Sequence, residues 1–239
     1  MKEQRPKGQK LKYAAAIKEL TVGVTSALAE HGFASSRVGK QPVFSRRQGD
    51  ASCSFFLVQM SSGSARPFVA IELAAVATEL RGLVDEHLLA WPLGEPAVIC
   101  AGVAELYRDP DGKIRTAGRV HARVGEYAVC HASCLAAALE DLPQDFEEYV
   151  LPLFDRLGSV AAADAFYHDD PASILRRYAN GWLEHAFVGI TLAALMRRAD
   201  FAAWRDHYRA LVATPASLNP RAEVSLAAFD ALTAALPAR

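Results

Sequence analysis

Residues 43–73, VFSRRQGDASCSFFLVQMSSGSARPFVAIEL, decide the fold, because they contain three apolar segments separated by two turn sequences. The three apolar segments are residues 43–46, 52–60 and 68–73. The turn sequences between them are residues 48–50 and 61–64. Apolar side chains occur on both faces of the middle segment, which is typical of a strand in the centre of a sheet. Short β-rich segments joined by turns of this kind predict an antiparallel meander.

The residues before this meander predict an amphipathic helix. Apolar residues recur three or four positions apart, so that they share one face of a helix: Tyr13, Ile17, Leu20, Val24 and Leu28. Gly32 follows at the position of a C-cap glycine, and Phe33 is placed to fold back on the last turn. The polar, basic residues 1–9 predict a disordered arm.

The middle of the chain predicts one more helix and a hairpin. Apolar residues at helical spacing predict a helix over residues 78–90. The sequence Asp109-Pro110-Asp111-Gly112 is a strong turn signal, because proline fixes φ at the second position and glycine closes the turn. The strands that this turn would join are residues 98–107 and 114–124.

From Ser133 onward the apolar pattern is helical. The predicted helices cover residues 145–157, 159–166, 173–196 with a break near residues 180–181, 201–212, and a last helix that starts at Asn219-Pro220. Ser159 and Asn219 are suited to cap the helices that follow them. Strands followed by a run of helices favour an α+β protein over an alternating α/β protein.

The predicted fold class is therefore α+β, with an N-terminal helix and a small, mostly antiparallel sheet followed by a helical C-terminal half. The predicted organisation is a basic disordered arm at 1–9, an α+β portion at 10–140 and a helical portion at 141–239. No long segment rich in proline and glycine separates the two portions, so we expect them to pack as one unit.

Composition indicates a globular protein of the cytoplasm. The chain has 239 residues, of which 51% are hydrophobic and 22% charged. No apolar run reaches the roughly 20 residues that span a bilayer. The charged N-terminus is not followed by an apolar signal-peptide core, so we expect a cytoplasmic protein with its four cysteines reduced. The net charge of −1 conceals an excess of basic residues in the first 50 positions.

The order of several short motifs resembles a known family. After the first predicted helix come Gly32-Phe33, Phe44-Ser45-Arg46, an apolar strand ending at Gln59-Met60-Ser61, the strand 68–73 and, later, the helix 149–157. This order resembles a family of uncharacterised bacterial proteins known only as a domain of unknown function, of the four-three-zero-four type. The resemblance implies a bacterial α+β protein, and it brings no established activity.

The best candidate for a binding site is a short basic stretch in the second predicted hairpin. Arg119, His121 and Arg123 alternate with apolar residues, which places them on the polar face of a strand. Arginine pairs can hold a phosphate or a carboxylate through paired hydrogen bonds. A solvated strand face with alternating charge is the plainer interpretation of the same pattern.

Two other groups contain side chains that could bind a metal. Cys130 and Cys134 are four residues apart, with His131 between them, and zinc favours such ligands. The sequence offers no second pair to complete a four-ligand site, so buried or idle thiols are the expected outcome. His168-Asp169-Asp170 could bind a cation or exchange protons, but the following Pro171 predicts a solvated turn.

Two helical pairs complete the histidine candidates, Glu184-His185 and Asp206-His207. Such pairs are usually surface residues or histidines with satisfied hydrogen bonds in the core, and we expect no catalytic role for them.

The sequence carries none of the common catalytic signatures. It has no glycine-rich phosphate loop, no nucleophile elbow and no zinc-binding H-E-x-x-H helix. These observations favour a non-catalytic protein-interaction or accessory module with a protein partner, no cofactor, no metal and no membrane. Two alternatives stay open: a hydrolase or metal-dependent enzyme of unrecognised type, and nucleic-acid association through the basic N-terminal arm.

Overall fold

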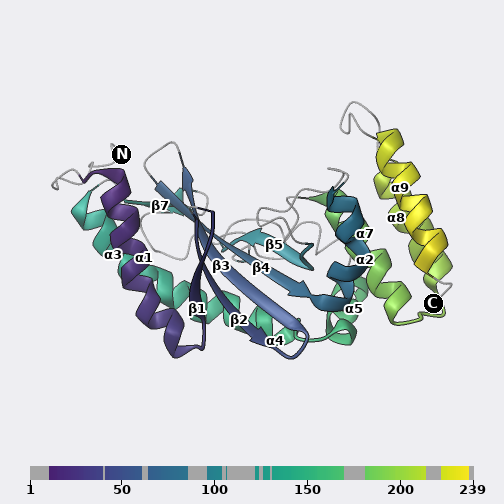
Figure 1. Ribbon diagram of the computed structural model, residues 1–239, viewed down its shortest axis with the longest axis horizontal. Helices are drawn as coiled ribbons and strands as arrows, with labels where there is room; N and C mark the ends of the chain where they lie inside the picture. The colour runs from purple at the N-terminus through teal and green to yellow at the C-terminus, as the bar shows by residue number, and fades with distance from the viewer. Residues whose placement is uncertain are drawn as a thin grey trace, which may run out of the picture. The chain divides into compact units, whose positions relative to one another are not determined.

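The computed structural model describes residues 11–39, 41–60, 64–85, 96–103, 106, 122–123, 126–129, 131–169, 181–213 and 222–236. Within them an N-terminal helix is followed by a sheet and then by a run of helices (Figure 1). The predicted α+β class is confirmed, with the N-terminal helix, the sheet and the helical C-terminal half in the predicted order.

Among the described residues the sheet has seven strands: β1 (Ala34–Val38), β2 (Gln41–Gln48), β3 (Ala51–Met60), β4 (Ser64–Leu73), β5 (Ile99–Gly102), β6 (Ala122–Arg123) and β7 (Glu126–Ala128). The strand order is β1-β2-β3-β4-β7-β6, and β5 also pairs with β4. The pairs β1–β2, β4–β7 and β6–β7 are antiparallel. The predicted meander strands correspond to β2, β3 and β4.

Helix α1 (Tyr13–Glu30) forms as its apolar spacing predicts. Its buried residues lie three or four positions apart and make one face: Ala16, Leu20, Val24 and Leu28. The helix ends at Glu30 with His31 as its C-cap, and Gly32 follows with a φ of 78°, which suits glycine because it has no Cβ. The amide of Phe33 then donates to the carbonyl of Leu28 at 3.0 Å, and the Phe33 ring is buried. Both predictions for this helix end are confirmed.

Strand β3 has buried apolar side chains at consecutive positions, as a central strand requires: Cys53, Phe55, Phe56 and Leu57. Strand β1 was not predicted. All five of its side chains are exposed, so its sequence has no apolar alternation that could reveal it. It forms through backbone pairing with β2, in a register that runs from Ala34 opposite Ser45 to Val38 opposite Gln41.

Only the ends of the predicted second hairpin lie among the described residues. Strand β5 pairs with β4, and β6 pairs with β7. The amide of Val98 continues the first pairing by donating to the carbonyl of Ile71 at 2.7 Å. The turn predicted at residues 109–112 lies outside the described residues. Alternation identifies a strand but not its neighbour, so the sequence did not predict that β5 pairs with β4. The hairpin itself stays a prediction.

The helices after the meander are α2 (Ala74–Asp85), α3 (Ala132–Asp145), the π-helical turn η2 (Phe146–Val150), α4 (Leu151–Arg156), α5 (Val160–Asp169), α7 (Trp182–Leu195), α8 (Phe201–Val212) and α9 (Ala222–Ala235). Ser159 caps α5, because its Oγ accepts from the amide of Ala162 at 3.2 Å. None of the described helices combines the length and apolar character that crossing a bilayer requires.

Backbone contacts divide the chain into two compact units. The first contains Met1–Arg46, Cys53–Val69 and Ala101–Phe154, and the second contains Arg47–Ser52, Ala70–Cys100 and Asp155–Arg239. Each unit is therefore made of several separate stretches of the chain. The predicted packing of portions 10–140 and 141–239 as one unit stays a prediction. In the first unit α1 packs against α3, and Phe146 meets Phe33 and Phe55 edge-on. In the second unit α7 packs against α2, α5, α8 and α9.

Candidate functional site

The predicted binding cluster is only partly described. Arg119 and His121 lie outside the described residues. Arg123 lies in the two-residue strand β6, where it is opposite Glu126 of β7. Cys130 also lies outside the described residues, whereas Cys134 is a buried, free thiol in α3 and His131 precedes that helix. Within the described parts of the chain, no three His, Cys, Asp or Glu side chains are grouped as metal ligands.

His168 is not in a solvated turn, and that prediction was wrong. Helix α5 continues through Asp169, and His168 in its last turn is only 7% exposed. The Nδ1 atom of His168 lies 2.8 Å from Oδ1 of Asp164 and 2.9 Å from the carbonyl oxygen of Asp164. Both partners can only accept a hydrogen bond when the carboxylate is ionised, so Nδ1 carries the proton and Nε2 the lone pair. Spacing of four residues on a helix makes this pair possible.

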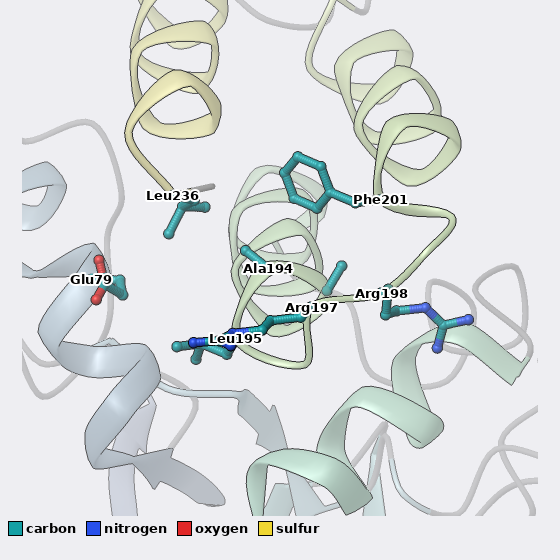
Figure 2. Close-up of a pocket in the computed structure, with 8 residues that line it drawn as sticks. Glu79, Ala194, Leu195, Arg197, Arg198, Phe201 and Leu236 are labelled. Carbon is teal, nitrogen blue, oxygen red and sulfur yellow. The ribbon is translucent and has the colours of Figure 1, made fainter. Parts of the chain in front are cut away.

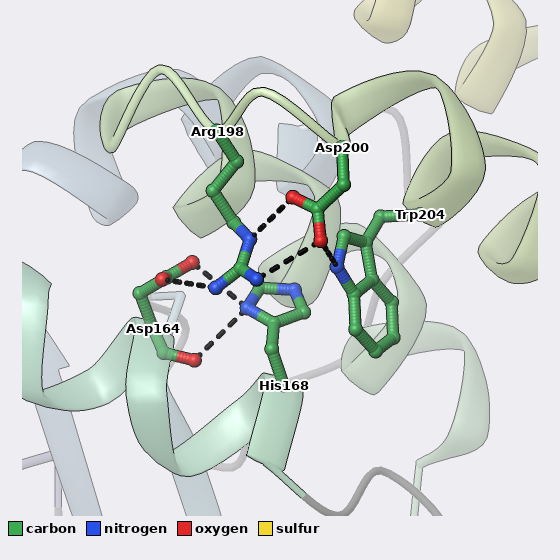
Figure 3. Close-up of polar contacts among 5 residues, drawn as sticks. All are labelled: Asp164, His168, Arg198, Asp200 and Trp204. Atoms are coloured by element: carbon green, nitrogen blue, oxygen red, sulfur yellow. Dashed lines mark hydrogen bonds and ion pairs between the residues drawn. The ribbon is translucent and has the colours of Figure 1, made fainter.

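Arg198 joins this pair to the start of α8. Its Nη1 donates to Oδ2 of Asp164 at 3.0 Å, and its Nε and Nη2 donate to the two oxygens of Asp200 at 2.8 and 3.0 Å (Figure 3). Trp204 Nε1 donates to the same Asp200 carboxylate at 3.0 Å. Hydrogen bonds from Arg198, and then from Trp204, lower the pKa of Asp200 to about 2. We call Asp164, His168, Arg198, Asp200 and Trp204 the arginine network.

A second buried histidine lies beside the arginine network. His185 of α7 is 4% exposed and stacks on the Tyr167 ring with centroids 4.8 Å apart. The Tyr208 ring lies 5.7 Å from His185 and 6.0 Å from His168. Burial, followed by the nearby His207 and His168, lowers the pKa of His185 to about 3. The sequence alone predicted no special role for His185, because the aromatic rings around it come from α5 and α8, which are distant in the chain.

The polar atoms at the centre of this group have no hydrogen-bond partner among the described residues. They are Nε2 of His168, Nε2 of His185 and the hydroxyl of Tyr208, and all three are fully buried. An Asp–His pair such as Asp164–His168 can orient an imidazole for proton transfer or for a metal. The Nε2 atom of His168 is buried and has no hydrogen-bond partner among the described residues. The arrangement holds α5, α8 and the α7–α8 link together.

Gly189 of α7 allows α8 to approach closely. A Cβ built on Gly189 would overlap the ring and hydroxyl of Tyr208, which is completely buried. We expect Gly189→Ala to lower the free energy of unfolding by about 1–3 kcal/mol, the usual cost of overpacking. Urea unfolding followed by circular dichroism measures this loss.

Gly82 of α2 provides the matched control for Gly189, because it is exposed and a Cβ built on it meets nothing within 4 Å. Gly82→Ala should raise the free energy of unfolding by up to about 1 kcal/mol, as alanine favours a helix over glycine. Adding Tyr208→Leu to Gly189→Ala should recover part of the loss. An unchanged stability in Gly189→Ala would contradict the close contact.

A pocket of about 590 Å³ opens beside the arginine network in the second unit (Figure 2). The described residues lining it come from α2, α7, the α7–α8 link, the start of α8 and the end of α9: Glu79, Ala193, Ala194, Leu195, Arg197, Arg198, Phe201 and Leu236. Most of these side chains are apolar. A cavity of this size that combines apolar walls with a small set of charged groups is typical of a ligand-binding site.

The two arginines of the pocket differ in their hydrogen bonds and ion pairs. Arg198 points away from Glu79 and uses three of its nitrogens on Asp164 and Asp200 (Figures 2 and 3). The Arg197 side chain extends the other way, toward the side of the pocket where Glu79 lies (Figure 2). The Arg197 guanidinium forms no ion pair with a described residue, whereas Glu79 has an interaction of its own. Arg197 is therefore the cation that the pocket offers to a ligand.

The backbone of Arg197 is left-handed, with a φ of 50°. Its amide donates to the carbonyl of Ala194 at 2.9 Å, and the amide of Arg198 donates to the carbonyl of Ala193 at 3.1 Å. These bonds end α7 at a position that usually holds glycine, because a side chain there is strained. Among the described residues, no other non-glycine residue has a positive φ.

Comparisons with known proteins found no relative. No family model matches the chain. No curated protein matches it, and no solved structure does. The resemblance to the uncharacterised bacterial family thus stays a prediction, and the function has to be argued from the site alone.

Proposed function

We propose that this protein is a non-catalytic protein-binding module of the bacterial cytoplasm, and that its partner docks in the pocket beside Arg197. The observation that carries the proposal is an open, mostly apolar pocket lined by Arg197, an exposed residue whose backbone is left-handed and whose guanidinium forms no ion pair with a described residue. Non-glycine residues in such conformations are concentrated at functional sites. Of the three charged residues that line the pocket, Arg198 is bound to Asp164 and Asp200, and Glu79 has an interaction of its own. The Arg197 guanidinium beside apolar walls therefore favours recognition of an apolar, negatively charged partner segment.

The main alternative is an acid–base enzyme, and the Asp164–His168 pair is the observation that favours it. Proton transfer requires the imidazole nitrogen to reach a bound substrate. The Nε2 atom of His168 is buried without solvent contact, so we rank this alternative below partner binding. Nucleic-acid association depends on the arm at 1–9, which lies outside the described residues. Binding that does not weaken with added salt would count against that third candidate.

Native mass spectrometry of the protein purified at low salt from its own host tests the proposal. We expect a second protein at fixed stoichiometry. Ala194→Trp should abolish its capture, because Ala194 lines the pocket and the indole would fill the space. Ala202→Trp is the matched control, since Ala202 is exposed on α8 and is not among the pocket residues.

Capture that Ala194→Trp removes and Ala202→Trp preserves would support docking in the pocket. Equal capture by both variants would place the partner elsewhere and overturn the site. A single bare mass for the unsubstituted protein, under the same conditions, would overturn the binding-module proposal.

A further inference from the structure

We infer that the pocket binds the C-terminal end of its partner: Arg197 pairs with the terminal carboxylate, and the apolar walls hold the last side chain. This inference rests on the proposed function and names the feature of the partner that is recognised. The relevant side chains are Arg197 on one side and Ala194, Leu195, Phe201 and Leu236 around it (Figure 2). Guanidinium groups bind carboxylates through two parallel hydrogen bonds.

The backbone of Arg197 is the first argument for a ligand. A left-handed residue ends α7, and glycine would occupy that position without strain. The helix dipole does not explain the arginine at this position. A basic side chain one residue away would interact with the dipole equally well and would not need a positive φ. Arg198 already occupies such a position and is engaged with Asp164 and Asp200. A ligand in the pocket explains why the strained residue is an arginine.

The composition of the walls is the second argument, because it distinguishes a chain end from an internal segment. An internal acidic segment would bring several backbone amides and carbonyls against apolar walls, where they would lack partners. A C-terminal apolar residue carries its carboxylate and its side chain on the same Cα. The Arg197 guanidinium and the apolar side chains beside it can therefore bind the whole group, while Glu79, which also lines the pocket, has an interaction of its own.

Fluorescence polarisation with defined peptides tests the inference. The probes are fluorescein-labelled hexapeptides that end in Leu, Val or Phe, prepared with a free C-terminal carboxylate or with a C-terminal amide. We expect the free carboxylates to bind at least about tenfold more tightly than the amides, since a charged hydrogen bond contributes that much. Octanoate serves as a competitor that carries a carboxylate and an apolar chain but no peptide.

Three variants separate the charge of Arg197 from its backbone. Arg197→Gln should lose the preference for the free carboxylate, and Arg197→Lys should retain part of it. Arg197→Gly should also lose the preference. Relative to Arg197→Gln, however, it should melt about 2–4 °C higher, because glycine removes the strain of the left-handed conformation. Loss of binding with a gain in stability cannot come from misfolding.

Equal binding of acids and amides, or unchanged binding by Arg197→Gln, would overturn the inference. Octanoate binding without any peptide binding would overturn it as well, because the occupant would then be a fatty acid. If Ala194→Trp removes the host partner while Arg197→Gln and removal of the partner's last residue leave capture unchanged, the binding-module proposal stands and the inference fails. Loss of the host partner in these last two experiments would support the inference.

Discussion

Acidification should destabilise the protein steeply, with a loss of about 1.4 kcal/mol in the free energy of unfolding for each pH unit below about 6.5, from His185 alone. The folded protein keeps His185 neutral, because burial lowers its pKa to about 3. The unfolded chain takes up this proton near pH 6.5, so it binds more protons than the folded chain between these two values. Stability is therefore present above pH 6.5 and is lost as the pH falls toward 3. His168, whose pKa burial also lowers, adds in the same direction.

His185→Leu tests the assignment to one side chain. Leucine does not titrate, so the slope of unfolding free energy against pH between pH 4 and 6.5 should become shallower by about 1.4 kcal/mol per unit. Thr191→Val is a matched control, because Thr191 is buried in the same helix and its hydroxyl donates to the carbonyl of Phe187 within that helix. The control should keep the original slope. Urea unfolding at several pH values gives both slopes, and identical slopes in His185→Leu and the unsubstituted protein would contradict the burial of a neutral imidazole.

Asp164→Ala should lower the free energy of unfolding by about 1–3 kcal/mol, because it removes the carboxylate that pairs with His168 and leaves one end of the Arg198 guanidinium without its partner. The backbone carbonyl of Asp164 still accepts from Nδ1 of His168 in this variant. Arg198 keeps some solvent contact, which limits the loss. Asp164→Asn should give a smaller loss, since the amide oxygen can still accept from His168. Urea unfolding at pH 7 measures all of these variants.

Asp200→Ala is the matched control for Asp164→Ala, because Asp200 bonds to the same arginine from an exposed position. Exposed ion pairs contribute little to stability, so its loss should be much smaller than that of Asp164→Ala. Equal losses in the two variants would contradict the view that the buried carboxylate anchors the arginine network.

Much of the fold could be predicted from local pattern. The apolar stripe of α1 predicts the helix, and the glycine after it predicts where the helix ends. The apolar runs of β3 and β4 give the centre of the sheet. Strand β1 could not be predicted, since its side chains are all exposed and only its backbone pairing defines it. The partner of β5 could not be predicted either, because strand pairing is a tertiary property.

The site was much harder to predict from sequence. The spacing of Asp164 and His168 is a helix signal that could have been recognised, but Pro171 favoured a turn and hid it. His185 is recognisable as special only once Tyr167 and Tyr208 surround it. Arg197 gives no sequence signal, because its importance comes from a backbone angle. The predicted candidates Arg119 and His121 lie outside the described residues.

Backbone hydrogen exchange, measured with and without the partner captured from the host, tests most directly whether the pocket is the docking site. The account predicts slower exchange in the presence of the partner at the end of α7, through the α7–α8 link to Phe201, and near Leu236, the segments that line the pocket. Unchanged exchange in these segments, with slowing confined to other parts of the chain, would contradict it.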